Sequence, residues 1–127
     1  MKQAYIINGV RSAIGNFGGT LSSVRTDDLA AFVLRELQKK NSLVDFSKVG
    51  DVLMGCANQA GEDNRNVARM ALLLAGYPLT IPGQTVNRLC ASGLSAAIDA
   101  SRAIQVGDED LMIAAGVENM TRGPWVM

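Results

Sequence analysis

The sequence contains no histidine, only three prolines and two cysteines, and no excess of charge of either sign. Without histidine, this chain by itself cannot form a His-ligated metal site or a Ser-His or Cys-His catalytic pair. Its twelve basic and twelve acidic residues leave it without the basic excess that binding to nucleic acid or to an anionic membrane usually requires. We therefore expect no nucleic-acid and no membrane partner, and we expect small molecules or protein surfaces instead.

The chain also lacks a CxxC pair, a run of eighteen apolar residues and a basic, apolar leader at its start. Cys56 and Cys90 are too far apart in sequence for a redox or zinc motif. No segment is long and apolar enough to span a bilayer. These absences favour a reducing compartment, and we expect a cytoplasmic location.

What is present is typical of a soluble globular domain. The chain has 127 residues, of which 48% are hydrophobic and 19% are charged, so disorder is excluded. This length suits one domain, and no internal repeat or linker divides it. We expect one domain over residues 1–127.

Hydrophobic periodicity predicts alternating strands and helices. An apolar run at residues 4–7 predicts a first strand, and the glycine-rich segment 15–19 predicts a loop after it. Thr26 precedes two acidic residues, which suits the N-cap of a helix over residues 26–40. The later elements are a strand at 49–54, a helix from Val67 ending at Gly76, a strand at 84–87, a helix from Cys90 to about Val106 ending at Gly107, and a strand at 111–115. This βαβαβαβ order predicts an α/β fold, a mostly parallel sheet covered by helices on both faces.

Cys90 is the strongest candidate for chemistry, because it lies at a strand-to-helix turn in the segment TVNRLCASG, residues 85–93. Unpaired N–H groups at a helix N-terminus favour a thiolate and can receive an oxyanion. The alternative is that Cys90 is a small buried hydrophobic residue, which is the commoner role of a lone cysteine.

Four segments carry a resemblance that decides between these alternatives. Residues 87–104, NRLCASGLSAAIDASRAI, resemble the N-x-x-C-x-S-G signature of the thiolase family, in which the cysteine is the nucleophile. Residues 11–15, RSAIG, are similar to the family's R-T-P-[IF]-G loop, and residues 115–124, AGVENMTRGP, to its G-G-x-E-S-M-S-x-A-P segment. Residues 55–74 are especially similar to the branch that cleaves 3-oxoadipyl-CoA in aromatic degradation.

The resemblance implies a fold, an activity and a missing part. Thiolases are about three times this length, with two core domains and a CoA-binding insertion, so the chain resembles the N-terminal half of the three-layer thiolase core. By resemblance Cys90 is the acylated nucleophile, coenzyme A thioesters are the substrates, and no resident cofactor or metal is needed. The family's histidine and second cysteine belong to the missing part, so the chain alone is expected to be inactive.

The resemblance also implies partners. The strand at residues 84–87 is expected at the sheet edge, where it pairs across a dimer axis, and the Cys90 helix is expected to be buried against the second core domain. We therefore expect a homo-oligomer or a complementary C-terminal chain. A noncatalytic module that kept this fold for assembly is the alternative function.

Other polar residues are expected to have structural roles. We expect Cys56 to be packed, Glu118 and the pair Glu62 and Asp63 to be solvated or to cap backbone groups, and Asn87 with Arg88 to shape the turn or touch a subunit. The methionines 54, 70, 112 and 120 are expected to fill the core. The glycines at 15–19 lack the spacing of a phosphate-binding loop.

Overall fold

The computed structural model describes residues 1–58, 61–63, 65–125 and 127. Its sheet has three parallel strands in the order β2-β1-β3. Leu53 in the central strand lies opposite Gln84 on one side and Ala114 on the other. The strands are β1 (Asp51–Gly55), β2 (Gly83–Val86) and β3 (Met112–Gly116). Because all three are parallel, their carboxyl ends meet at one edge of the sheet.

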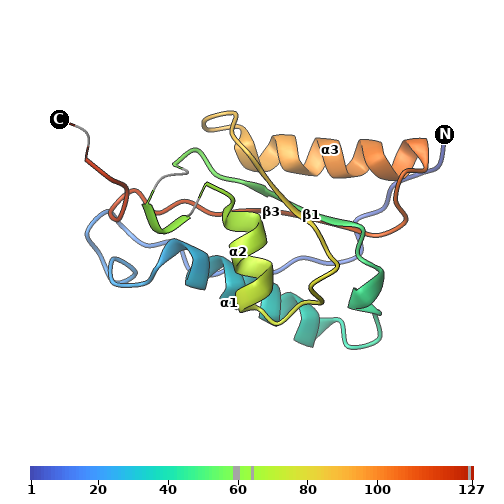
Figure 1. Cartoon of the computed structure of the whole chain (residues 1–127), viewed down its shortest axis with the longest axis horizontal. Helices are drawn as coiled ribbons and strands as arrows, with labels where there is room; N and C mark the ends of the chain where they lie inside the picture. Colours follow the sequence, from blue (N-terminus) through green and yellow to red (C-terminus); the bar gives the residue numbers. More distant parts are fainter. Residues whose placement is uncertain (59–60, 64, 126) are drawn as a thin grey trace.

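Helices cover both faces of this sheet, as the sequence predicts (Figure 1). One face carries α3, and the other carries α2 with α1 packed against it. Two short 3₁₀ turns complete the described elements. The helical elements are α1 (Thr26–Lys40), η1 (Phe46–Lys48), η2 (Gly61–Asp63), α2 (Val67–Leu74) and α3 (Ser92–Val106).

The two faces of the sheet are packed differently. The larger core lies on the α1 and α2 side and includes the fully buried Leu34, Met54 and Leu72. On the α3 side, Leu53 packs against Ala96 and Ala100. Because the residues that α3 turns toward the sheet are small, the helix can approach the sheet closely.

The outward face of α3 is apolar and exposed. Leu94 is 66% exposed and Ile98 is 40% exposed. Residues four apart lie on one face of a helix, so these two side chains form a contiguous apolar surface. Nothing in the described chain covers it.

The helix at residues 26–40 has the predicted bounds, but its N-terminus is capped differently. Thr26 is the first helical residue rather than the N-cap, and Arg25 occupies the N-cap position without a side-chain capping bond. The N–H of Thr26 donates instead to the carboxylate of Glu62, 36 residues away. A tertiary contact therefore replaces the local cap that the sequence predicts.

The predicted first strand at residues 4–7 is not formed. This segment is extended but pairs with no strand, and Ile6 is 97% exposed. Lys2 ties its start to the C-terminal end of α3 through the carbonyl of Gln105. A hollow of about 390 Å³ lies between residues 12–22, α1 and the end of β3. A strand needs a hydrogen-bonding neighbour, and none of the described residues provides one here.

The remaining boundaries agree with the sequence to within a few residues. Gly107 ends α3 in the left-handed conformation, φ +89°, and its N–H returns to the carbonyl of Ala103. β2 lies at the sheet edge, as expected. Over the described parts of the chain, no helix combines the length and the apolar character needed to cross a bilayer.

Candidate active site

An open groove lies at the carboxyl edge of the sheet, beside the N-terminal end of α3. Its walls come from the segments that follow β1 and β3, from the turn between β2 and α3, and from the C-terminal loop. The lining residues are Phe17, Gly55, Ala57, Asn58, Leu89, Cys90, Ser92, Gly93, Gly116, Val117, Glu118, Met120, Gly123, Pro124 and Trp125. This edge is the usual ligand-binding edge of parallel α/β folds.

Cys90 lies in this groove with its thiol exposed. Exposure contradicts the alternative that Cys90 is a small buried hydrophobic residue. The sequence-based prediction that Cys90 begins the helix is also wrong, because α3 begins at Ser92 with Ala91 as its N-cap. Cys90 therefore precedes the N-cap, where the first N–H groups of the helix and its dipole favour negative charge.

Two polar side chains fix the turn that carries Cys90. The hydroxyl of Ser92, which is 4% exposed, accepts the N–H of Arg88 at 2.8 Å and donates to the carbonyl of Leu89 at 2.6 Å. Asn87 accepts the N–H of Leu89 at 3.0 Å. Leu89 has φ +49°, a left-handed conformation that a leucine adopts only when its surroundings hold it. The expected role of Asn87 in turn geometry is confirmed.

One glycine allows β1 and α3 to converge at this turn. A Cβ on Gly55 would overlap the backbone nitrogen of Gly93 and the carbonyl carbon of Ser92. A Cβ on Gly116 would meet the Cα of Gly93 at 3.6 Å, an ordinary contact, so β3 does not require a glycine there. Gly55 therefore lets the N-terminal end of α3 lie directly against the end of the central strand. Sequence reasoning missed this role, although glycines ending two strands were its signal.

Glu118 forms a second set of contacts in the groove. Its two carboxylate oxygens accept the N–H groups of Ala57 at 2.8 Å and Asn58 at 2.9 Å. The thiol of Cys56 lies 3.8 Å from the same carboxylate and 3.1 Å from the carbonyl of Asn58. Cys56 is buried, as expected, and Glu118 caps backbone groups, also as expected.

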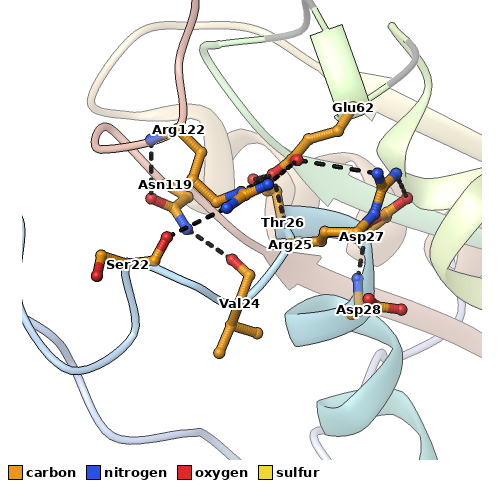
Figure 2. Close-up of polar contacts among 9 residues, drawn as sticks. All are labelled: Ser22, Val24, Arg25, Thr26, Asp27, Asp28, Glu62, Asn119 and Arg122. Carbon is orange, nitrogen blue, oxygen red and sulfur yellow. Dashed lines mark hydrogen bonds and ion pairs between the residues drawn. The ribbon is translucent and has the colours of Figure 1, made fainter.

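A cluster of charged residues holds the C-terminal loop against the start of α1 (Figure 2). The guanidinium of Arg122 donates to both carboxylate oxygens of Glu62, at 2.7 and 2.8 Å. Arg25 forms a similar two-bond pair with the buried Asp27, at 3.0 and 2.8 Å. The amide of Asn119 donates to the carbonyl of Val24 at 3.0 Å. Because Met120, Gly123, Pro124 and Trp125 of this loop line the groove, the cluster fixes one of its walls.

These contacts shift the pKa values of the charged groups. The hydrogen bond from Arg122 lowers the pKa of Glu62, and the paired carboxylates raise the pKa values of Arg122 and Arg25. Glu62 is thus a structural carboxylate that caps Thr26, as expected, rather than an acid or base. The side chain of Asp63 lies outside the described part of the chain. Among the described residues, no three His, Cys, Asp or Glu side chains gather as metal ligands would.

The methionines follow the prediction only in part. Met54 is buried, and Met112 packs against the smaller core. Met70 is half-buried. The prediction that Met120 fills the core is wrong, because Met120 is 74% exposed and lines the same groove as Cys90.

The fold and the site together define a class: a parallel α/β domain with an exposed cysteine at a strand-to-helix turn, where a covalent intermediate can form. The sequence model of "Thiolase, N-terminal domain" matches residues 4–127. The chain therefore belongs to the thiolase N-terminal domain family.

Known proteins agree with this assignment. The 3-oxoadipyl-CoA/3-oxo-5,6-dehydrosuberyl-CoA thiolase of Escherichia coli K12 is 61% identical over 127 residues, 100% of this chain and 32% of that protein. A beta-ketoadipyl-CoA thiolase of Pseudomonas aeruginosa is 59% identical over 126 residues, 99% of this chain and 31% of that protein. The crystal structure of the Bacillus anthracis acetyl-CoA acetyltransferase superposes with a TM-score of 0.86 at 40% identity, covering 93% of this chain and 29% of that one. The chain spans about a third of the length of the curated relatives.

Proposed function

We propose that this chain supplies the nucleophile of a thiolase, an acyl-CoA C-acyltransferase acting on 3-ketoacyl-CoA thioesters, and that Cys90 is that nucleophile. The observation that carries the proposal is the position of the exposed Cys90 thiol, in a groove at the N-terminal end of α3. The names of the relatives support a dicarboxylic substrate such as 3-oxoadipyl-CoA.

The proposed reaction has two steps. In the first, the Cys90 thiolate attacks the 3-keto carbon, the C2–C3 bond breaks, and its electron pair leaves with acetyl-CoA as an enolate that is then protonated. In the second, the thiolate of a second coenzyme A attacks the acyl-Cys90 thioester, which releases the shortened acyl-CoA and restores Cys90. The backbone N–H of Cys90 polarises the thioester oxygen.

Neither the base that deprotonates Cys90 nor the acid that protonates the enolate is assigned to this chain, which has no histidine. We propose that the chain is the N-terminal core domain, and that a CoA-binding insertion and a C-terminal core domain supply these groups. Coenzyme A is then a co-substrate rather than a resident cofactor. The cytoplasm is the proposed location, because neither Cys56 nor Cys90 forms a disulfide, as is usual in reducing compartments.

The test uses a full-length chimera in which this chain replaces the matching segment of the E. coli relative. We expect the chimera to cleave 3-oxoadipyl-CoA to acetyl-CoA, and expect its intact mass to show an acyl adduct at Cys90 when coenzyme A is withheld. Cys90→Ala should remove both, while Cys56→Ala, the matched control, should retain the adduct. The 127-residue chain alone should show no turnover, because losing parts of a coupled catalytic unit costs several powers of ten in rate.

A folded chimera without acylation at Cys90 would overturn the catalytic proposal. It would favour the second candidate, a noncatalytic assembly module. That candidate is supported by the exposed apolar side chains of Leu94 and Ile98 on α3, since monomers rarely leave such surfaces uncovered.

A further inference from the structure

We propose that Glu118 is a positioning residue for Cys90, acting through the backbone of Ala57 and the side chain of Asn87. This inference rests on the proposed function for its catalytic meaning, although the contacts that support it do not. Glu118 and Cys90 lie 28 positions apart in sequence and line the same groove.

The first link is the hold of Glu118 on the segment after β1. Its two oxygens accept two successive backbone N–H groups, those of Ala57 and Asn58. A carboxylate with one bond on each oxygen fixes both the position and the tilt of the segment it holds. The carbonyl of Ala57 belongs to the same peptide as the N–H of Asn58, so Glu118 also fixes the direction of that carbonyl.

The second link is Asn87. Its side-chain N–H donates to the carbonyl of Ala57 at 3.1 Å, and its side-chain oxygen accepts the N–H of Leu89 at 3.0 Å. One amide group therefore joins the segment held by Glu118 to the residue before Cys90. If the Ala57 carbonyl moves, Asn87 loses the partner that orients its side-chain oxygen toward Leu89.

The third link is the strained turn itself. Leu89 is held at φ +49°, a left-handed conformation that is unfavourable for a residue with a side chain. Its backbone sets the direction of the peptide that ends in the N–H of Cys90, the group proposed to polarise the thioester. Through these three links, Glu118 controls the backbone geometry at Cys90. None of the contacts described above joins Glu118 directly to Leu89 or Cys90.

The experiment compares residue-resolved amide hydrogen exchange in the 127-residue chain and in Glu118→Gln. Glutamine keeps the size of the side chain but offers one carbonyl oxygen to two N–H groups. We expect exchange at Leu89 to accelerate about 10-fold, as loss of one hydrogen bond of ordinary strength predicts, together with faster exchange at Ala57 or Asn58. Exchange at Leu53 in the central strand should not change. Glu36→Gln removes a surface ion pair with Lys39; it is the matched control and should leave exchange at Leu89 unchanged.

A double-mutant cycle tests the route. The readout is the alkylation rate of Cys90 by iodoacetamide, mapped by mass spectrometry, in Glu118→Gln, Asn87→Ala and the double variant. If Glu118 acts through Asn87, the second substitution adds little to the first. Additive effects, or faster exchange at Leu53 equal to that at Leu89, would overturn the proposal.

These readouts are independent of thiolase activity. If the effects of Glu118→Gln and Asn87→Ala are non-additive but the chimera is not acylated, the proposed function is refuted and the positioning role remains. Acylation of Cys90 without coupling would refute the positioning role alone.

Discussion

Replacing Glu62 by glutamine tests whether the charged cluster at the start of α1 stabilises the fold. The carboxylate accepts two bonds from Arg122 and one from the N–H of Thr26, and its side chain is only 13% exposed. Glutamine preserves the shape and one acceptor but loses the charge.

The magnitude follows from the burial of the pair. Hydrogen bonds to charged groups contribute about 1.5–3 kcal/mol when shielded, whereas exposed ion pairs contribute about 0–1 kcal/mol. Glu62 is shielded but Arg122 is a third exposed, so we expect Glu62→Gln to lower the free energy of unfolding by about 1–2 kcal/mol. Urea unfolding at pH 7 measures this as a lower midpoint with an unchanged slope. Glu36→Gln, which breaks the exposed pair with Lys39, should not move the midpoint measurably.

The pH dependence has a definite sign. Arg122 lowers the pKa of Glu62 in the folded chain below its ordinary value of 4.5, so the unfolded chain binds the proton more tightly. The stability that this carboxylate contributes is therefore complete above the ordinary value and is lost as the pH falls through the lowered pKa. The difference between the wild-type chain and Glu62→Gln should be largest near pH 7 and should shrink below pH 4. Equal stability at pH 7, or a difference that persists in acid, would refute this reasoning.

Three further predictions concern packing, a buried phenol and association. Gly55→Ala should lower the free energy of unfolding by about 1–3 kcal/mol, because its Cβ would overlap the backbone at the start of α3. The control is Gly93→Ala, whose Cβ would meet nothing within 4 Å. Equal effects of the two substitutions in urea unfolding would contradict the close packing of Gly55 against α3. Burial raises the pKa of Tyr77 to about 12, so the ultraviolet difference titration between the wild-type chain and Tyr77→Phe should show a midpoint near that pH. The free energy of unfolding should fall as the pH rises from about 10. A titration midpoint near 10 would contradict the burial of this phenol. The 127-residue chain should associate as its concentration rises, and Leu94→Glu should weaken this association. Leu43→Glu, a change at another exposed leucine, should not. Sedimentation that shows a 13.4 kDa particle at all concentrations would contradict the role of the α3 surface.

Local sequence signals determined most of the secondary structure. The helix at residues 26–40 has its predicted bounds because apolar spacing and flanking charges act within the segment itself. Gly107 ends α3 as predicted, because only a local left-handed turn is needed there. The same local signals predict that Cys90 lies between a strand and a helix, and the structure places it between β2 and α3.

Only the tertiary structure decided what holds these elements and the site together. The apolar run at residues 4–7 has the composition of a strand, but a strand exists only when another strand accepts its hydrogen bonds, and the described chain offers none. Glu62 caps a helix 36 residues away, and Glu118 holds two backbone N–H groups that are 60 and 61 residues away. Gly55 is required by the backbone of α3 rather than by its own strand. Such contacts depend on which distant segments the fold brings within a few ångströms, and no local pattern of side chains encodes that distance.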